Sequence, residues 1–151
     1  SRAQHPDDPR RRPRQPQRRV TQEPNMSKQP IHTPRAPAAI GPYSQAVRAA
    51  NTVYLSGEIP LHPATMQLVA GGVREQAEQV FANLAAVAQA AGGSLDNAVR
   101  VTVYLTDLTE FPLVNEIMAR HFAEPYPARV TIGVRELPRG AAVEVDAILV
   151  I

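Results

Sequence analysis

Residues 127–151, PARVTIGVRELPRGAAVEVDAILVI, decide the fold of this chain. From 128 to 134, valine and isoleucine alternate with arginine, threonine and glycine, and from 143 to 149 apolar residues flank two acidic ones. Successive side chains of a strand point to opposite faces, so a two-residue period is typical of β-strands. The end of the chain is therefore predicted to form two strands.

The segment 137–140, LPRG, is expected to join these two strands as an antiparallel hairpin. A symmetric turn would place Gly133 opposite Glu144, so that Arg129 and Glu144 project from one face, unless a bulge shifts the register. A forked guanidinium beside a carboxylate can hold an anionic substrate and activate water. The hairpin is thus predicted to carry a small polar site.

Length and composition predict a single soluble globular domain, because 151 residues with 44% hydrophobic content suffice for an ordinary core. The chain has no cysteine, which excludes thiol chemistry and fits a reducing, cytoplasmic compartment. No run approaches the roughly 20 apolar residues of a membrane span. The four histidines are scattered, without the spacing of metal ligands, so a metal site is not expected.

The first 25 residues differ from the rest, because seven arginines outweigh three acidic residues there and leave a charge of about −2 for the remainder. Such a basic, proline-rich segment is predicted to be disordered. Because Met26 resembles a natural start, residues 1–25 are predicted to be a leader or an added sequence. A targeting peptide is the rival interpretation, which the prolines oppose. The domain is assigned to 26–151, and its acidic balance argues against nucleic acid as a partner.

Strands are also predicted before the first helix. Segments 44–48 and 52–56 read as a hairpin, in whose turn Asn51 is expected to take the left-handed conformation. The segment 66–70 is a candidate edge strand before Gly71.

Two helices follow from apolar residues at intervals of three and four. The first spans 73–91 and the second 110–123, with Thr109 as its expected cap, and the strand 98–105 lies between them. The order β-β-(β)-α-β-α-β-β predicts an α+β fold, a mixed sheet with two helices on one face. Since two helices cannot cover both faces, burial against other subunits is expected.

Five motifs in order resemble the RidA/YjgF family of enamine/imine deaminases, over about 31–151. They are AAIGPYSQA at 38–46, LSGEIP at 55–60, VN at 114–115, PAR at 127–129 and VEVDA at 143–147. The resemblance implies a chorismate-mutase-like fold and a homotrimer with active sites between subunits.

The resemblance also assigns roles to individual residues. Arg129 is expected to bind the substrate carboxylate and Glu144 to position or activate water, with Asp146 a weaker candidate; a surface ion pair and a solvated acid are the alternatives. Tyr43 is expected to line the pocket, unless it is a packing aromatic of the turn. Asn115 matches a pocket asparagine, or is an exposed or capping amide.

Three further residues complete the expected site. The Ser56 hydroxyl and the Gly57 backbone are expected to line it, and no base or nucleophile elbow accompanies Ser56. At Thr131 many members of the family have cysteine, and the backbone there contacts ligand. If only the backbone at this position matters, threonine has no effect on the site; if the thiol tunes the chemistry or the redox response, that feature is absent here.

The activity implied by the resemblance is hydrolysis of 2-iminobutanoate and 2-iminopropanoate to 2-keto acids and ammonia, without a cofactor. It protects pyridoxal-phosphate enzymes from enamines that pyridoxal-phosphate-dependent dehydratases release. Two alternatives stay open: a non-catalytic, ligand-binding or chaperone-like trimer, and a ribonuclease or translation inhibitor, against which the acidic domain counts.

Overall fold

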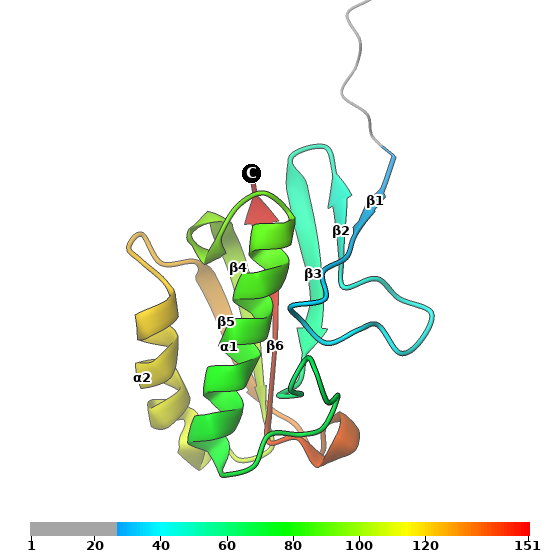
Figure 1. Ribbon diagram of the computed structural model, residues 1–151. Coiled ribbons are helices and arrows are strands. Elements are labelled where there is room, and N and C mark those ends of the chain that lie inside the picture. The colour runs from blue at the N-terminus through cyan, green and yellow to red at the C-terminus, as the bar shows by residue number, and fades with distance from the viewer. Residues whose placement is uncertain (1–26) are drawn as a thin grey trace, which may run out of the picture.

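The computed structural model describes residues 27–151, which form a six-stranded mixed sheet with two α-helices packed on one face (Figure 1). The predicted α+β architecture is confirmed, whereas the predicted disorder of 1–25 lies outside the described residues. Across the sheet the strand order is β1-β2-β3-β6-β4-β5. The elements are β1 Gln29–Ile31, β2 Ala46–Ala49, β3 Thr52–Glu58, α1 Val73–Ala90, β4 Ala98–Leu105, α2 Phe111–His121, β5 Ala128–Gly133 and β6 Val143–Val150.

The strand order shows that the predicted C-terminal hairpin is wrong. β5 pairs in parallel with β4, with Arg129 beside Val101, and β6 pairs antiparallel with the other edge of β4, with Glu144 beside Tyr104. β6 lies centrally because every second residue of it, from 143 to 149, is buried beneath the helices, and a strand with such an apolar row belongs inside the sheet. Alternation along one strand identifies its buried face, but it does not identify the neighbouring strand.

The sheet pairing also assigns the faces of these residues. Paired residues on adjacent strands point to the same side, so Arg129 shares the helix-covered face with fully buried Val101. Glu144 alternates with buried Val143 and Val145 and therefore points to the opposite face. Arg129 and Glu144 of one chain thus lie on opposite faces of the sheet.

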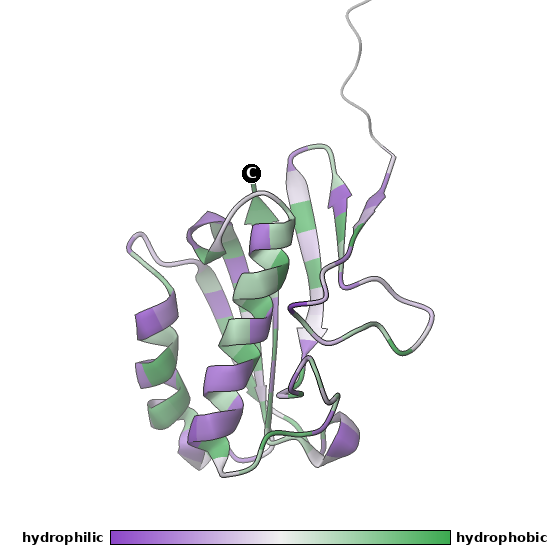
Figure 2. Cartoon of the chain, viewed as in Figure 1, coloured by the Kyte–Doolittle hydropathy of each residue, from purple (hydrophilic) through white to green (hydrophobic). Residues whose placement is uncertain are grey.

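The core fills the space between the sheet and the helices. Buried apolar residues recur along both helices. The hydropathy colouring shows hydrophobic and hydrophilic bands alternating along each helix (Figure 2). The largest fully buried side chains are Phe81, Leu84, Leu105, Ile117, Leu149, Val53, Val80, Val87, Val101, Val103, Val114 and Val143.

The other face of the sheet is not covered by any described residue. Tyr54 is 52% exposed, and Ile132 and Val150 are each 41% exposed. These three belong to β3, β5 and β6, so apolar side chains are exposed across the width of the sheet. An apolar patch of this kind is typical of a protein–protein interface.

The first predicted hairpin is confirmed in β2 and β3, but in its turn Ala50, not Asn51, has the left-handed conformation, with φ of 53°. The predicted edge strand at 66–70 is wrong, because only one isolated bridge, from Leu61 to Leu68, forms there. β1, which pairs with β2, was not expected.

Both predicted helices are present, with differences at the start of the second. Thr109 does not cap α2; instead its backbone N–H and its hydroxyl donate to the Asp107 carboxylate, which caps the 3-10 turn Leu108–Glu110. That turn runs directly into α2, so Phe111 becomes the first residue of the helix.

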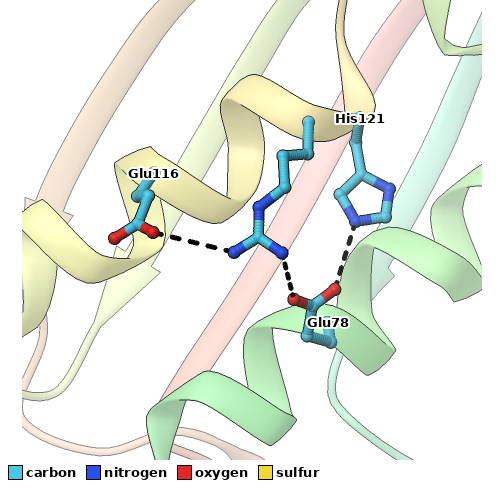
Figure 3. A network of polar contacts seen from close by, with 4 residues as sticks. Glu78, Glu116 and His121 are labelled. Carbon is cyan, nitrogen blue, oxygen red and sulfur yellow. Dashed lines mark hydrogen bonds and ion pairs between the residues drawn. The ribbon is translucent and has the colours of Figure 1, made fainter.

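A polar network joins the outer surfaces of α1 and α2 (Figure 3). The Glu78 carboxylate lies 3.3 Å from Arg120 Nη1 and 3.5 Å from His121 Nε2, and the His121 ring stacks on Phe81 with 5.3 Å between ring centroids. Exposed ion pairs contribute only about 0–1 kcal/mol each, so this network fixes the contact geometry of the helices more than it stabilises the fold.

Candidate active site

Arg129 forms one half of the candidate site, against α2. Its Nη1 donates to Asn115 Oδ1 at 2.6 Å and lies 3.8 Å from Met118 Sδ, and its guanidinium carbon lies 4.9 Å from the centre of the Phe111 ring. The adjoining cavity of about 420 Å³ is lined by Asn115, Met118, Ala119, Tyr126, Pro127 and Arg129. The structure therefore brings two predicted site residues, Arg129 and Asn115, together in a cationic pocket.

Glu144 forms the other half, on the opposite face, beside Gly57. A Cβ atom on Gly57 would lie 3.0 Å from Glu144 Cδ, so a side chain there would push against the carboxyl group. The Ser56 hydroxyl donates a hydrogen bond of 2.5 Å to the backbone carbonyl of Ser44. Ser56 and Gly57 line a small cavity together with Tyr43, whose hydroxyl accepts from the Ile40 N–H at 3.4 Å.

In the Glu144 half of the site, the surroundings of the Glu144 carboxyl group favour proton exchange. Partial burial, reinforced by the nearby charge of Asp146, raises the pKa of Glu144. Asp146, the weaker candidate, accepts a hydrogen bond of 2.9 Å from the Tyr104 hydroxyl. Burial, followed by this hydrogen bond, raises the pKa of Tyr104. Of the two acids, Glu144 is the better placed for acid–base chemistry.

Glu58 is a titratable residue that sequence reasoning missed. Its side chain is only 6% exposed, and burial, with the charge of Glu144 as a second cause, raises its pKa from 4.5 to about 8. Strict alternation from buried Leu55 would turn Glu58 outward, but a register shift between Leu55 and Glu58 pairs it with buried Val145. The bulge therefore turns the carboxyl group inward.

Thr131 lies on β5 beside Val103, on the helix-covered face, and its hydroxyl has no neighbour to bond. Its Oγ1 is the one buried side-chain polar atom without a hydrogen-bond partner within 27–151. An unsatisfied buried hydroxyl costs about 1–3 kcal/mol of stability. The hydroxyl therefore contributes nothing to the stability of the fold.

Thr131→Val is accordingly expected to raise the free energy of unfolding by about 1 kcal/mol, because it keeps the shape and removes the unsatisfied hydroxyl. Thr131→Ser, the matched control, keeps the hydroxyl and loses the methyl group, and is expected to lower stability. Urea unfolding of the three proteins measures both effects. A valine variant less stable than the serine variant would contradict this account of the hydroxyl.

Residues 27–151 contain neither a membrane-crossing helix nor a metal-binding cluster. No helix within 27–151 is long and apolar enough to cross a membrane. In the same range, no group of three or more histidine, cysteine, aspartate or glutamate side chains could hold a metal ion.

The chain is similar to several known proteins. A family model described as endoribonuclease L-PSP matches residues 33–151. Proteins named 2-iminobutanoate/2-iminopropanoate deaminase are 46% identical in Dermatophagoides farinae, over 80% of this chain and 94% of that protein, and 49% identical in Mus musculus, over 80% and 89%. The crystal structure of RidA from Psychrobacter sp. PAMC 21119 superposes with a TM-score of 0.79 at 50% identity, covering 82% of this chain and 99% of that one.

Proposed function

Because the chain belongs to the endoribonuclease L-PSP family, which is the RidA/YjgF family, we propose that it hydrolyses short 2-imino acids to 2-keto acids and ammonia. The observation that carries this proposal is the cavity beside the Arg129 guanidinium, which suits a substrate carboxylate. A carboxyl group of raised pKa, Glu144, lies on the opposite face of the sheet. The relatives' names specify 2-iminobutanoate and 2-iminopropanoate. The carboxylate of such a substrate suits the Arg129 half of the site, and its electrophilic imine carbon suits the Glu144 half.

The chemistry needs binding, orientation and proton transfer. Arg129 holds the substrate carboxylate through paired N–H donors. Glu144 takes a proton from a water molecule as that water attacks the electrophilic imine carbon, and it returns this proton to the imine nitrogen, which becomes the amine. Collapse of the resulting carbinolamine breaks the C–N bond, so that one imine and one water give one 2-keto acid and one ammonia. No step calls for a metal or an organic cofactor.

A complete site requires two chains, in a homotrimer. Arg129 and Glu144 of one chain lie on opposite faces of its sheet, and the uncovered apolar face needs a partner. In the proposed assembly, one chain supplies Arg129, Asn115 and Thr131, and its neighbour supplies Glu144, Tyr43, Ser56 and Gly57. The enamines that pyridoxal-phosphate-dependent dehydratases release in the cytoplasm tautomerise to such substrates.

Mixing two inactive variants tests the shared site. Arg129→Ala and Glu144→Gln are each expected to be inactive alone, whereas trimers reassembled from equal amounts should recover about one quarter of wild-type imine hydrolysis, because each site draws its two residues from different chains. Mass spectrometry of the intact assemblies verifies that the chains have mixed.

A double variant, with Arg129→Ala and Glu144→Gln on the same chain, provides the control. When this double variant is mixed equally with wild type, about one quarter of the sites should again be intact. Failure of the two single variants to regain activity in verified mixed trimers would place both residues in one chain's site and overturn the proposal.

A further inference from the structure

One stripe of α2 contacts the Arg129 side chain. Phe111, Asn115 and Met118 are spaced four and three residues apart and therefore lie on one face of the helix. Each of them touches the guanidinium group: the ring lies at 4.9 Å, the amide oxygen at 2.6 Å and the sulfur at 3.8 Å. Of these residues only Asn115 was expected at the site, and nothing in the family motifs pointed to Phe111.

From these contacts, and on the premise of the proposed function, we infer that Phe111 and Asn115 are positioning residues that hold the Arg129 guanidinium in its carboxylate-binding orientation. An aromatic face attracts a cation that lies over it, so Phe111 restrains the tilt of the guanidinium plane. The hydrogen bond to Asn115 fixes its rotation within that plane. An arginine on an edge strand without such contacts would lose more rotamer entropy on binding a ligand.

The contacts leave the other edge of the guanidinium available. Both polar contacts to α2 use Nη1, and no residue from 27 to 151 forms a hydrogen bond with Nε or Nη2. Nε and Nη2 together form a fork that fits the two oxygens of a carboxylate. The α2 stripe thus occupies one face and one nitrogen of Arg129, and it presents the remaining pair of donors to the substrate.

Asn115 is uncharged, and this matters as much as the acceptor oxygen that it supplies to Arg129. None of the ion pairs found within 27–151 involves Arg129, so its positive charge is not neutralised within that part of the chain. An aspartate at position 115 would keep the acceptor but would add a carboxylate that competes with the substrate's own. An amide therefore orients Arg129 without weakening its attraction for an anion.

The matched pair Phe111→Leu and Phe111→Tyr tests the aromatic contact. Leucine fills similar space without a π face, and is expected to weaken binding of 2-oxobutanoate about 5- to 20-fold and to raise KM for the imine by the same factor, with kcat changed less than about twofold. Tyrosine keeps the face and should bind within about twofold of wild type. Calorimetric titration with 2-oxobutanoate measures binding without catalysis.

Two further variants complete the test. Phe122→Leu alters a buried ring that packs on Phe81 away from Arg129, so it should lower stability and leave binding of 2-oxobutanoate unchanged. Asn115→Asp should weaken that binding at least about tenfold. Equal binding by Phe111→Leu and wild type, or equal losses in the leucine and tyrosine variants, would overturn the inference. A wild-type protein that binds 2-oxobutanoate but hydrolyses no imine would overturn the proposed function alone.

Discussion

Arg129→Ala is expected to lower kcat/KM for 2-iminobutanoate by about 100- to 10,000-fold, because the substrate carboxylate loses two charge-assisted hydrogen bonds, each contributing about 1.5–3 kcal/mol. The loss should appear in both KM and kcat, since the same contacts orient the imine carbon toward water. The assay couples the protein to threonine dehydratase, which supplies the enamine, and follows disappearance of the imine.

Two arginine variants control for charge. Arg129→Lys keeps the positive charge but cannot form the fork, so its activity should lie between wild type and alanine. Arg74→Ala removes an exposed arginine from the first turn of α1 that does not line the cavity of Arg129, and should leave activity unchanged. If the imine disappears equally fast with wild type and with Arg129→Ala, the assignment of Arg129 as the carboxylate ligand is wrong.

Glu58→Gln should have the largest effect on stability, and the effect should depend on pH. The pKa of Glu58 rises from 4.5 to about 8 on folding, because the charged form is buried. Below pH 4.5 the carboxyl is protonated in both states; between 4.5 and 8 only the unfolded chain releases its proton, so the free energy of unfolding falls as pH rises. The total loss is on the order of 3–5 kcal/mol.

Glutamine keeps the shape of the protonated acid and cannot ionise, so its variant should lose this pH dependence. At pH 8, Glu58→Gln is expected to melt about 10 °C above wild type, and near pH 4 the two should melt together. Glu136→Gln changes an exposed glutamate and should follow the wild-type curve. Parallel curves for wild type and Glu58→Gln from pH 4 to 9 would show that Glu58 ionises freely in the folded protein.

The local elements could be predicted because their signals lie within short segments. The strands β5 and β6 follow from alternation, and α1 from apolar residues three and four apart. Their pairing could not be predicted, because a symmetric turn at 137–140 was the simplest connection and the sequence does not show that β4 lies between the two strands. Strand neighbours are chosen by the packing of the whole core.

The same limit applies to the site. The family motifs identified Arg129 and Glu144, but local spacing placed them on one face, where the sheet places them on opposite faces. The bulge that buries Glu58 has no signal in the residues around it. Phe111 was detectable, since it lies four residues before Asn115 on a predicted helix, but its contact with Arg129 requires the pairing of β5 with β4.

The opposite placement of Arg129 and Glu144 has a genetic consequence. In the proposed trimer every chain contributes to two sites, so an allele encoding a folded chain that lacks both residues would disable the sites on both sides of that chain. A trimer with two normal chains would keep only about one third of its sites. Such an allele would act dominantly. An allele whose product cannot fold would not enter trimers, so it would only lower the amount of functional protein.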